Sequence, residues 1–75
     1  MWTTERYRQF LRINGLTQAD FAGLLGHSAR AGQYWATSAL PPAAETMARL
    51  IEARPELLDV LRTLAAERDG KDGKV

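Results

Sequence analysis

The sequence predicts a small all-α protein built from five helices. Apolar residues recur three and four positions apart, no stretch alternates as a strand would, and glycine or proline separates the helical stretches. With 75 residues and no cysteine, the chain can bury one small core without disulfides. We therefore expect a single domain over residues 1–68 and a flexible tail over 69–75. No apolar run reaches the length of a membrane span and the start lacks a secretory signal, so a cytoplasmic protein is expected.

The first helix is predicted from the stretch "TTERYRQFLRING". A threonine can cap its start, Tyr7, Phe10 and Leu11 have helical spacing, and Gly15 suits the left-handed position just past a helix end. In this region Trp2 can form an aromatic lid on the core. The arginines Arg6, Arg8 and Arg12 either form a solvated face or include a contact to backbone phosphate. We favour the lid and the solvated face.

A second and a third helix follow, separated by a tight glycine turn. Thr17 is a good N-cap with Asp20 three residues on, and the helix it begins has only about two turns before Gly26 turns the chain. Ser28 then caps a third helix that extends to about Thr37. The predicted order is helix, tight turn, helix.

The fourth helix is predicted to begin at Pro42, because a proline at the first helical position loses no hydrogen bond. Arg54 precedes Pro55 and is expected to end it. Four residues are expected along its buried face: Ala43, Met47, Leu50 and Ile51.

A fifth helix is predicted over residues 55–68, "PELLDVLRTLAAER", with leucines along one side. These leucines either complete the core or hold two copies of the chain together, since a domain of this size has few buried positions. The residues expected at such a homodimer contact are Leu57, Leu61 and Leu64.

The stretch "LTQADFAGLLGHSARAGQYW" resembles the helix-turn-helix of the Cro and C1 repressor family, also called XRE-like. The residues that carry the resemblance are in register without a gap: Thr17, Gln18, Ala19, Asp20, Phe21, Ala22, Leu24, Leu25, Gly26, Ser28 and Trp35. The chain departs from the family at Gly32, where a branched apolar residue is usual, and at "ATS" after the tryptophan. The resemblance implies a compact lambda-repressor-like domain that binds double-stranded DNA. Such a protein would regulate transcription, as a repressor of its own or a neighbouring operon.

The outward face of the third helix has side chains suited to reading bases. Arg30 can donate two hydrogen bonds to guanine, Gln33 can pair with adenine or a phosphate, and Tyr34 can reach a phosphate or a thymine methyl group. The resemblance implies base contacts for Ala29, Arg30 and Tyr34, and a backbone contact for Gln18. The full predicted DNA-binding set is Gln18, Ser28, Ala29, Arg30, Gln33, Tyr34 and Thr37. The alternative is a polar face that is merely solvated.

Gly32 belongs to the buried side of the third helix, with Trp35. Glycine there destabilises the helix by roughly 1 kcal/mol relative to alanine. Either it lets a neighbouring aromatic ring lie against bare backbone, or it loosens a helix that becomes ordered on DNA. We favour the first interpretation.

No catalytic or metal site is predicted. His27 is the only histidine and has no cysteine nearby, so a packing or capping role in a half-buried turn is expected. Asp20 has no nucleophile or second carboxylate at useful spacing, so we expect it to cap a helix. No enzyme activity, cofactor or small-molecule ligand is therefore expected.

The distribution of charge is more informative than the net charge of +1. Up to Trp35, four arginines accompany two acidic residues, whereas four arginines accompany six acidic residues between Ala36 and Asp69. The first half of the chain is therefore the basic half. The alternative function is a protein-interaction module, antitoxin-like, that grips a partner through the leucine face of the fifth helix; the near-neutral charge slightly favours it.

Overall fold

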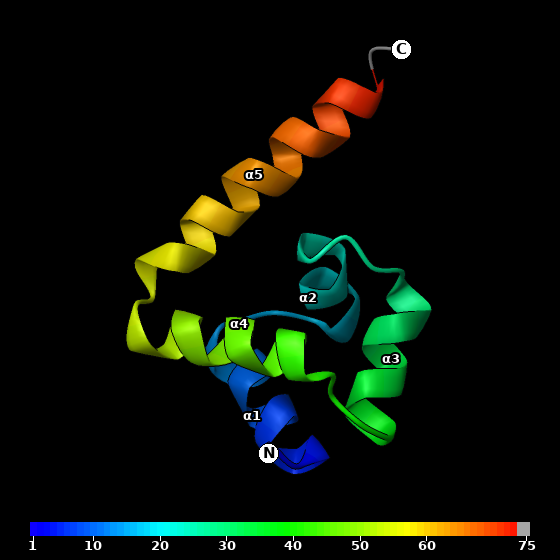
Figure 1. The fold of residues 1–75 in the computed structure, drawn as a ribbon, viewed down its shortest axis with the longest axis vertical. Helices are drawn as coiled ribbons and strands as arrows, with labels where there is room; N and C mark the ends of the chain where they lie inside the picture. Colours follow the sequence, from blue (N-terminus) through cyan, green and yellow to red (C-terminus); the bar gives the residue numbers. More distant parts are fainter. Residues whose placement is uncertain (74–75) are drawn as a thin grey trace.

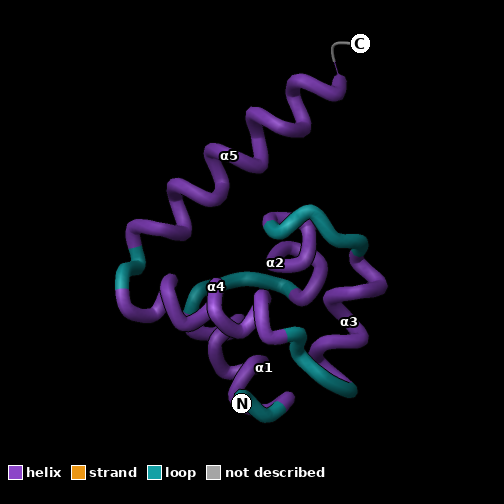
Figure 2. Tube along the Cα trace, viewed as in Figure 1, coloured by secondary structure: helices purple, strands orange, loops and turns teal. Residues whose placement is uncertain are grey.

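The computed structural model describes residues 1–73, and the side chains of residues 1–68. Within that part of the chain there are five helices and no strand, as predicted (Figure 1). The helices are α1 (Thr4–Ile13), α2 (Gln18–Leu24), α3 (Ala29–Thr37), α4 (Pro42–Ala53) and α5 (Glu56–Gly73). Figure 2 shows that short turns join them. Across residues 1–73, no helix combines the length and the apolar composition needed to cross a membrane.

Side-chain oxygens cap the first three helices at the positions that the sequence predicted. The hydroxyl of Thr3 accepts a hydrogen bond from the amide three residues on, at 3.1 Å. Thr17 and Asp20 form a reciprocal capping box, with both hydrogen bonds at 3.0 Å. The hydroxyl of Ser28 accepts from the amide of Ala31 at 3.2 Å. These bonds satisfy amides that a helix start leaves without a partner, and so fix where each helix begins.

Two glycines that follow helix ends are in the left-handed region, which was predicted for Gly15, while Gly26 was predicted to turn the chain. Gly15 has a φ of 65° and Gly26 a φ of 82°. Residues with a β-carbon rarely adopt these angles, so each glycine allows the chain to reverse direction within a few residues. The turn at Gly26 brings α3 back against α2.

The core is organised around the ring of Phe21 in α2. Its centroid lies 5.3 Å from that of Phe10, 5.9 Å from that of Tyr7 and 6.4 Å from that of Trp35. Trp2 is partly buried and packs against Phe10 at 5.6 Å, which fits the predicted lid. Edge-on and tilted ring pairs of this kind stabilise a small core beyond the area that they bury.

The buried face of α4 differs from the one that the sequence predicted. Ala44, Ala48 and Ile51 are buried, and Met47 is partly buried. Of the other residues expected on this face, Ala43 is exposed and Leu50 keeps 46% of its surface exposed. The helix is therefore rotated so that small alanines meet the core, which lets its backbone approach more closely than a leucine would allow.

Helix α5 extends further than predicted and contacts the body only along part of its length. It continues to Gly73, where the sequence predicted a flexible tail over 69–75; residues 74–75 lie outside the described residues. Adding residues to an existing helix costs far less than nucleating one, which explains the extension. Figure 1 shows α5 rising away from α1, so that its far end and the N-terminus lie at opposite ends of the long axis.

Candidate nucleic-acid interface

Helices α2 and α3 pack against each other through Gly32. This glycine is buried, and a β-carbon added to it would collide with the carbonyl oxygen of Gln18 and lie 2.8 Å from the carbonyl carbon and 3.0 Å from Ala22 Cβ. The favoured interpretation of close packing is thus supported, but the predicted neighbour is wrong. The closest atoms belong to the backbone of α2 and a methyl group, because the two helices cross here with nothing between them.

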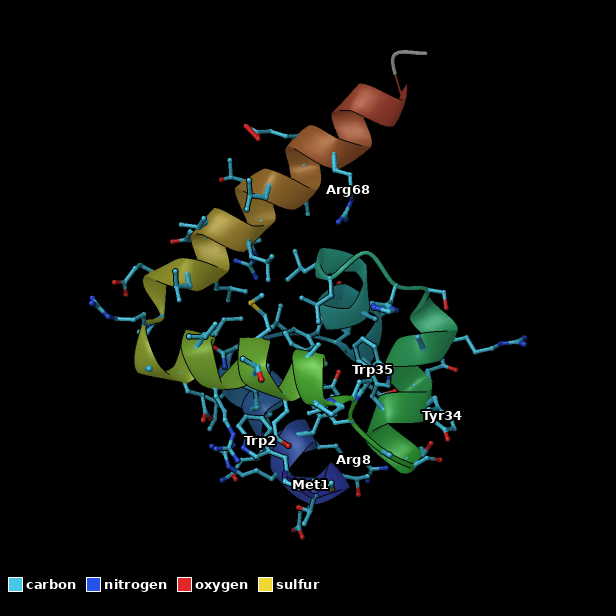
Figure 3. All side chains as sticks on the ribbon, in the orientation of Figure 1. Met1, Trp2, Arg8, Tyr34, Trp35 and Arg68 are labelled. Carbon is cyan, nitrogen blue, oxygen red and sulfur yellow. The ribbon has the colours of Figure 1, made fainter. Side chains whose placement is uncertain are left out.

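The outward face of α3 carries the predicted base-reading residues. Ala29, Arg30 and Tyr34 are all exposed, and Tyr34 keeps 60% of its surface free. Figure 3 shows Tyr34 on the outer side of α3 and Trp35 directed toward the core. The guanidinium of Arg30 makes no hydrogen bond or ion pair among the residues that the structure describes. Its donors are therefore available to an external acceptor.

Two of the predicted DNA contacts are exposed hydroxyls already engaged in the helix itself. The hydroxyl of Ser28 caps the start of α3. The hydroxyl of Thr37 donates to the carbonyl oxygens of Gln33 and Tyr34, at 3.2 and 3.3 Å. The hydroxyl of Thr37 uses its only hydrogen in these bonds, whereas the hydroxyl of Ser28 acts as an acceptor and keeps its hydrogen to donate to a phosphate. Ser28 and Thr37 thus stabilise the ends of α3 in this structure.

An open groove of about 560 Å³ runs between α1, the start of α2 and α3. It gathers two of the predicted residues, Gln18 and Gln33, and does not include Ala29, Arg30 or Tyr34. Its lining residues are Arg8, Leu11, Arg12, Leu16, Thr17, Gln18, Ala19 and Gln33. Below, this set is called the basic groove.

Sequence reasoning left Arg8 and Arg12 out of the candidate site. Their spacing of four residues places both side chains on one side of α1, and this signal could have identified them. The interpretation of the first helix as a simple solvated face is also incomplete. The Nε of Arg8 donates to the carbonyl oxygen of Ala36, at 3.1 Å, so that α1 is tied to the last turn of α3.

Arg6 has a third role, distinct from those of Arg8 and Arg12. Its guanidinium donates to both carboxylate oxygens of Glu52, at 2.6 and 2.7 Å, and lies 4.3 Å from the centre of the Trp2 ring. The ion pair joins α1 to α4, and it neutralises the charge of Arg6 within the protein.

The single histidine and the acidic cap do not form a reactive site. His27 is exposed, where a half-buried position was expected, and its ring packs edge-on to Trp35 at 5.1 Å. The carboxylate of Asp20 accepts hydrogen bonds in the capping box with Thr17, and these bonds lower its pKa. Within residues 1–73, no group of three or more histidine, cysteine, aspartate or glutamate residues is placed to hold a metal ion.

The three leucines predicted at a dimer contact differ in burial. Leu57 and Leu61 are partly buried against the core, whereas Leu64 keeps 55% of its surface exposed. Val60, four residues before Leu64, is 50% exposed. The apolar surface left on α5 is therefore centred on Val60 and Leu64, because the other two leucines face the body.

Arg68 joins α5 to the end of α2. Its Nη2 donates to the carbonyl oxygen of Gly23 at 2.9 Å, and Figure 3 shows the side chain directed from α5 toward α2. A cation is favourable there because the carbonyl end of a helix carries partial negative charge, and the carbonyl oxygen of Gly23 accepts this bond beside the one from the amide of Gly26. The bond holds α5 against the turn that precedes α3.

Comparison with known proteins does not assign the chain to a family. No protein-family model, curated protein or solved structure matches the chain significantly.

Proposed function

We propose that this protein binds double-stranded DNA in a sequence-specific manner, with α2, the turn at Gly26 and α3 as a helix-turn-helix. In this proposal α3 is the recognition helix, and the five helices form a lambda-repressor-like domain. The observation that carries it is the division of α3 into two sides. Gly32 and Trp35 are buried, while the side chains predicted to read bases are exposed.

The dimensions of α3 fit this role. Its nine residues make a helix roughly 14 Å long, and its exposed face has small Ala29 beside longer polar side chains. A major groove about 12 Å wide admits a helix, and the small residue allows close approach to the bases. Arg30 would donate to guanine, while Tyr34 would reach a phosphate or a thymine methyl group.

Binding of this kind would make the protein a transcriptional regulator. We propose repression by occupation of a promoter, of its own gene or of a neighbouring operon, with no catalytic step and no cofactor. Two copies would bind together as a homodimer, through the exposed apolar surface of α5 at Val60 and Leu64.

The test is selection of duplexes from a random pool, followed by affinity measurements on the selected sequence and on random DNA. Arg30→Ala is expected to cost about 1 to 3 kcal/mol on the selected sequence and to relax the preference at one base position. The matched control is Arg54→Ala, since Arg54 lies at the junction of α4 and α5 and pairs with Glu56 at 3.5 Å.

Two outcomes would overturn the proposal. If no sequence is enriched and the affinity for duplex DNA does not fall with salt, DNA is not the ligand. The exposed face of α5 would then support the alternative, a module that binds a partner protein. If DNA binds but Arg30→Ala keeps the parent's affinity and preference, α3 is not the reading element.

A further inference from the structure

We infer that the basic groove binds the sugar-phosphate backbone of a nucleic acid, with Arg8 and Arg12 as its cations. This inference rests on the proposed function and deepens it, because it assigns the electrostatic contact to α1. The ligand is the phosphodiester group, whose oxygens accept hydrogen bonds from guanidinium and amide donors.

The charge of the groove is the first argument. Two of its lining residues are arginines, and none of the described lining residues is acidic. The remaining polar residues are Thr17, Gln18 and Gln33, and both glutamines carry amide donors. An open concave surface with two cations and neutral donors suits an extended anionic chain.

Arg12 provides the second argument, because its charge is not neutralised. It is exposed in the last turn of α1, and its guanidinium makes no hydrogen bond or ion pair in the part of the chain that the structure describes. Three other arginines in the protein do pair with glutamates, at 2.6 to 3.5 Å: Arg6, Arg49 and Arg54. Arg12 can therefore exchange water for a phosphate without first breaking a protein contact.

Arg8 provides the third argument, because it is oriented before any ligand arrives. Its Nε uses one donor on the carbonyl oxygen of Ala36, which leaves the donors of its two terminal nitrogens. A side chain already held in place loses less conformational entropy when it binds. The same bond connects two walls of the groove, α1 and α3, and keeps their separation fixed.

The position of the groove beside α3 completes the argument. Gln33 lines the groove, while Arg30 and Tyr34 stand on the exposed face of the same helix and lie outside the groove. A phosphate backbone held in the groove would therefore flank the helix proposed to read bases. Contacts of this type set the register of a protein on DNA without carrying sequence information.

The decisive experiment compares Arg12→Gln with the parent protein on labelled duplexes, by fluorescence anisotropy at salt concentrations between 50 and 200 mM. Loss of one phosphate contact is expected to reduce the slope of log K against log salt by about 0.9. The ratio of the parent's affinity to the variant's affinity should then fall roughly 3.5-fold between 50 and 200 mM salt. The loss should be the same for the selected sequence and for random DNA.

Arg8→Gln and the double variant extend the test, with Arg54→Gln as the matched control for loss of a surface arginine. In the double variant, the slope of log K against log salt should decrease by about twice as much as in Arg12→Gln. Circular dichroism and thermal unfolding monitor the fold, since Arg8→Gln also removes the bond to Ala36. Arg12→Gln removes no hydrogen bond or ion pair within the described residues, and the same two measurements should show that its fold is retained.

The outcomes separate this inference from the proposed function. If the parent binds DNA with a steep salt dependence and Arg12→Gln keeps both slope and affinity, the groove is not the phosphate site while the proposed function stands. If Arg12→Gln changes the preference at one base, Arg12 reads a base edge and the inference is wrong. If the parent does not bind DNA at any salt concentration, both proposals fall.

Discussion

Gly32 in α3 lies against the main-chain carbonyl of Gln18 in α2, with no room for a β-carbon between them. The obstacle is backbone, which cannot move aside as the end of a flexible side chain can. Gly32→Ala is therefore expected to lower the free energy of unfolding by about 1 to 3 kcal/mol, although alanine is the better helix former. Urea unfolding followed by circular dichroism measures this change.

Gly23 is the matched control for this substitution. It lies inside α2, and a β-carbon built on it meets nothing within 4 Å. Gly23→Ala is expected to raise the free energy of unfolding by about 0.4 to 1 kcal/mol, because alanine restricts the unfolded chain at no steric cost. Equal effects of the two substitutions would mean that the close approach at Gly32 is absent in solution.

Gln18→Ala tests the assignment of Gln18 to the DNA backbone. Its carbonyl packs on Gly32 whatever its side chain, so the fold should be retained. Loss of a hydrogen bond from the amide to an anionic phosphate is expected to weaken binding about 10- to 150-fold, equally on the selected sequence and on random duplexes. Parallel titrations of the selected and the random duplex measure the loss of affinity on each. A loss confined to the selected sequence would assign Gln18 to a base edge.

The dimer proposal is tested at Leu64, which is 55% exposed and makes little contribution to the core. Leu64→Glu is expected to leave the helical content unchanged while light scattering shifts from the mass of a dimer to that of a monomer. Cooperative binding to the full site should weaken as well. The selected DNA should contain two half-sites related by a dyad, roughly 10 base pairs apart or a multiple of that.

Ile13→Glu is the control for the mass measurement, because Ile13 is an exposed apolar residue at the end of α1 and not on α5. It should leave the mass unchanged. A parent protein that is monomeric at high concentration and selects an asymmetric site would contradict the dimer, and α5 would then serve only as a wall of the core.

Tyr7 makes the stability of the fold sensitive to alkaline pH. Burial raises the pKa of its hydroxyl from 10.0 to about 12, so the folded state favours the neutral phenol. The resulting stability is fully present below pH 10 and is lost as the pH rises toward 12. Tyr7→Phe is expected to remove this loss, as measured by the midpoint of urea unfolding between pH 9 and 12.

The same substitution should be harmless at neutral pH. The hydroxyl of Tyr7 is buried and makes no hydrogen bond within the described residues, so removing it is expected to raise the free energy of unfolding by about 1 kcal/mol. Tyr34→Phe is the control, since Tyr34 is exposed. This variant should lose stability at alkaline pH as the parent does. If Tyr7→Phe is markedly less stable than the parent at pH 7, the hydroxyl has a partner in solution.

Local chemistry made the starts of the first three helices and the turns at Gly15 and Gly26 predictable, whereas the end of α5 and the residues that meet in the basic groove required the packed structure. Thr17, Ser28 and the two turn glycines act on backbone within three residues, so their roles follow from short sequence patterns. The basic groove combines residues from three helices, and no single stretch shows that Gln33 lines it together with Arg12 while Arg30 lies outside. The burial of Leu57 and the exposure of Leu64 likewise depend on how far α5 runs along the body.

The exposed side of α3 carries side chains that the fold does not need. Those of Ala29, Arg30 and Tyr34 make no hydrogen bond, ion pair or ring contact within the described part of the chain, while Gly32 and Trp35 anchor the helix from behind. These three outward positions can therefore change during evolution without a penalty in folding. Descendants of one ancestral domain could diverge in what they recognise while keeping the same interior. A combinatorial library at these positions would yield a set of proteins that share one scaffold and differ only in the surface they present.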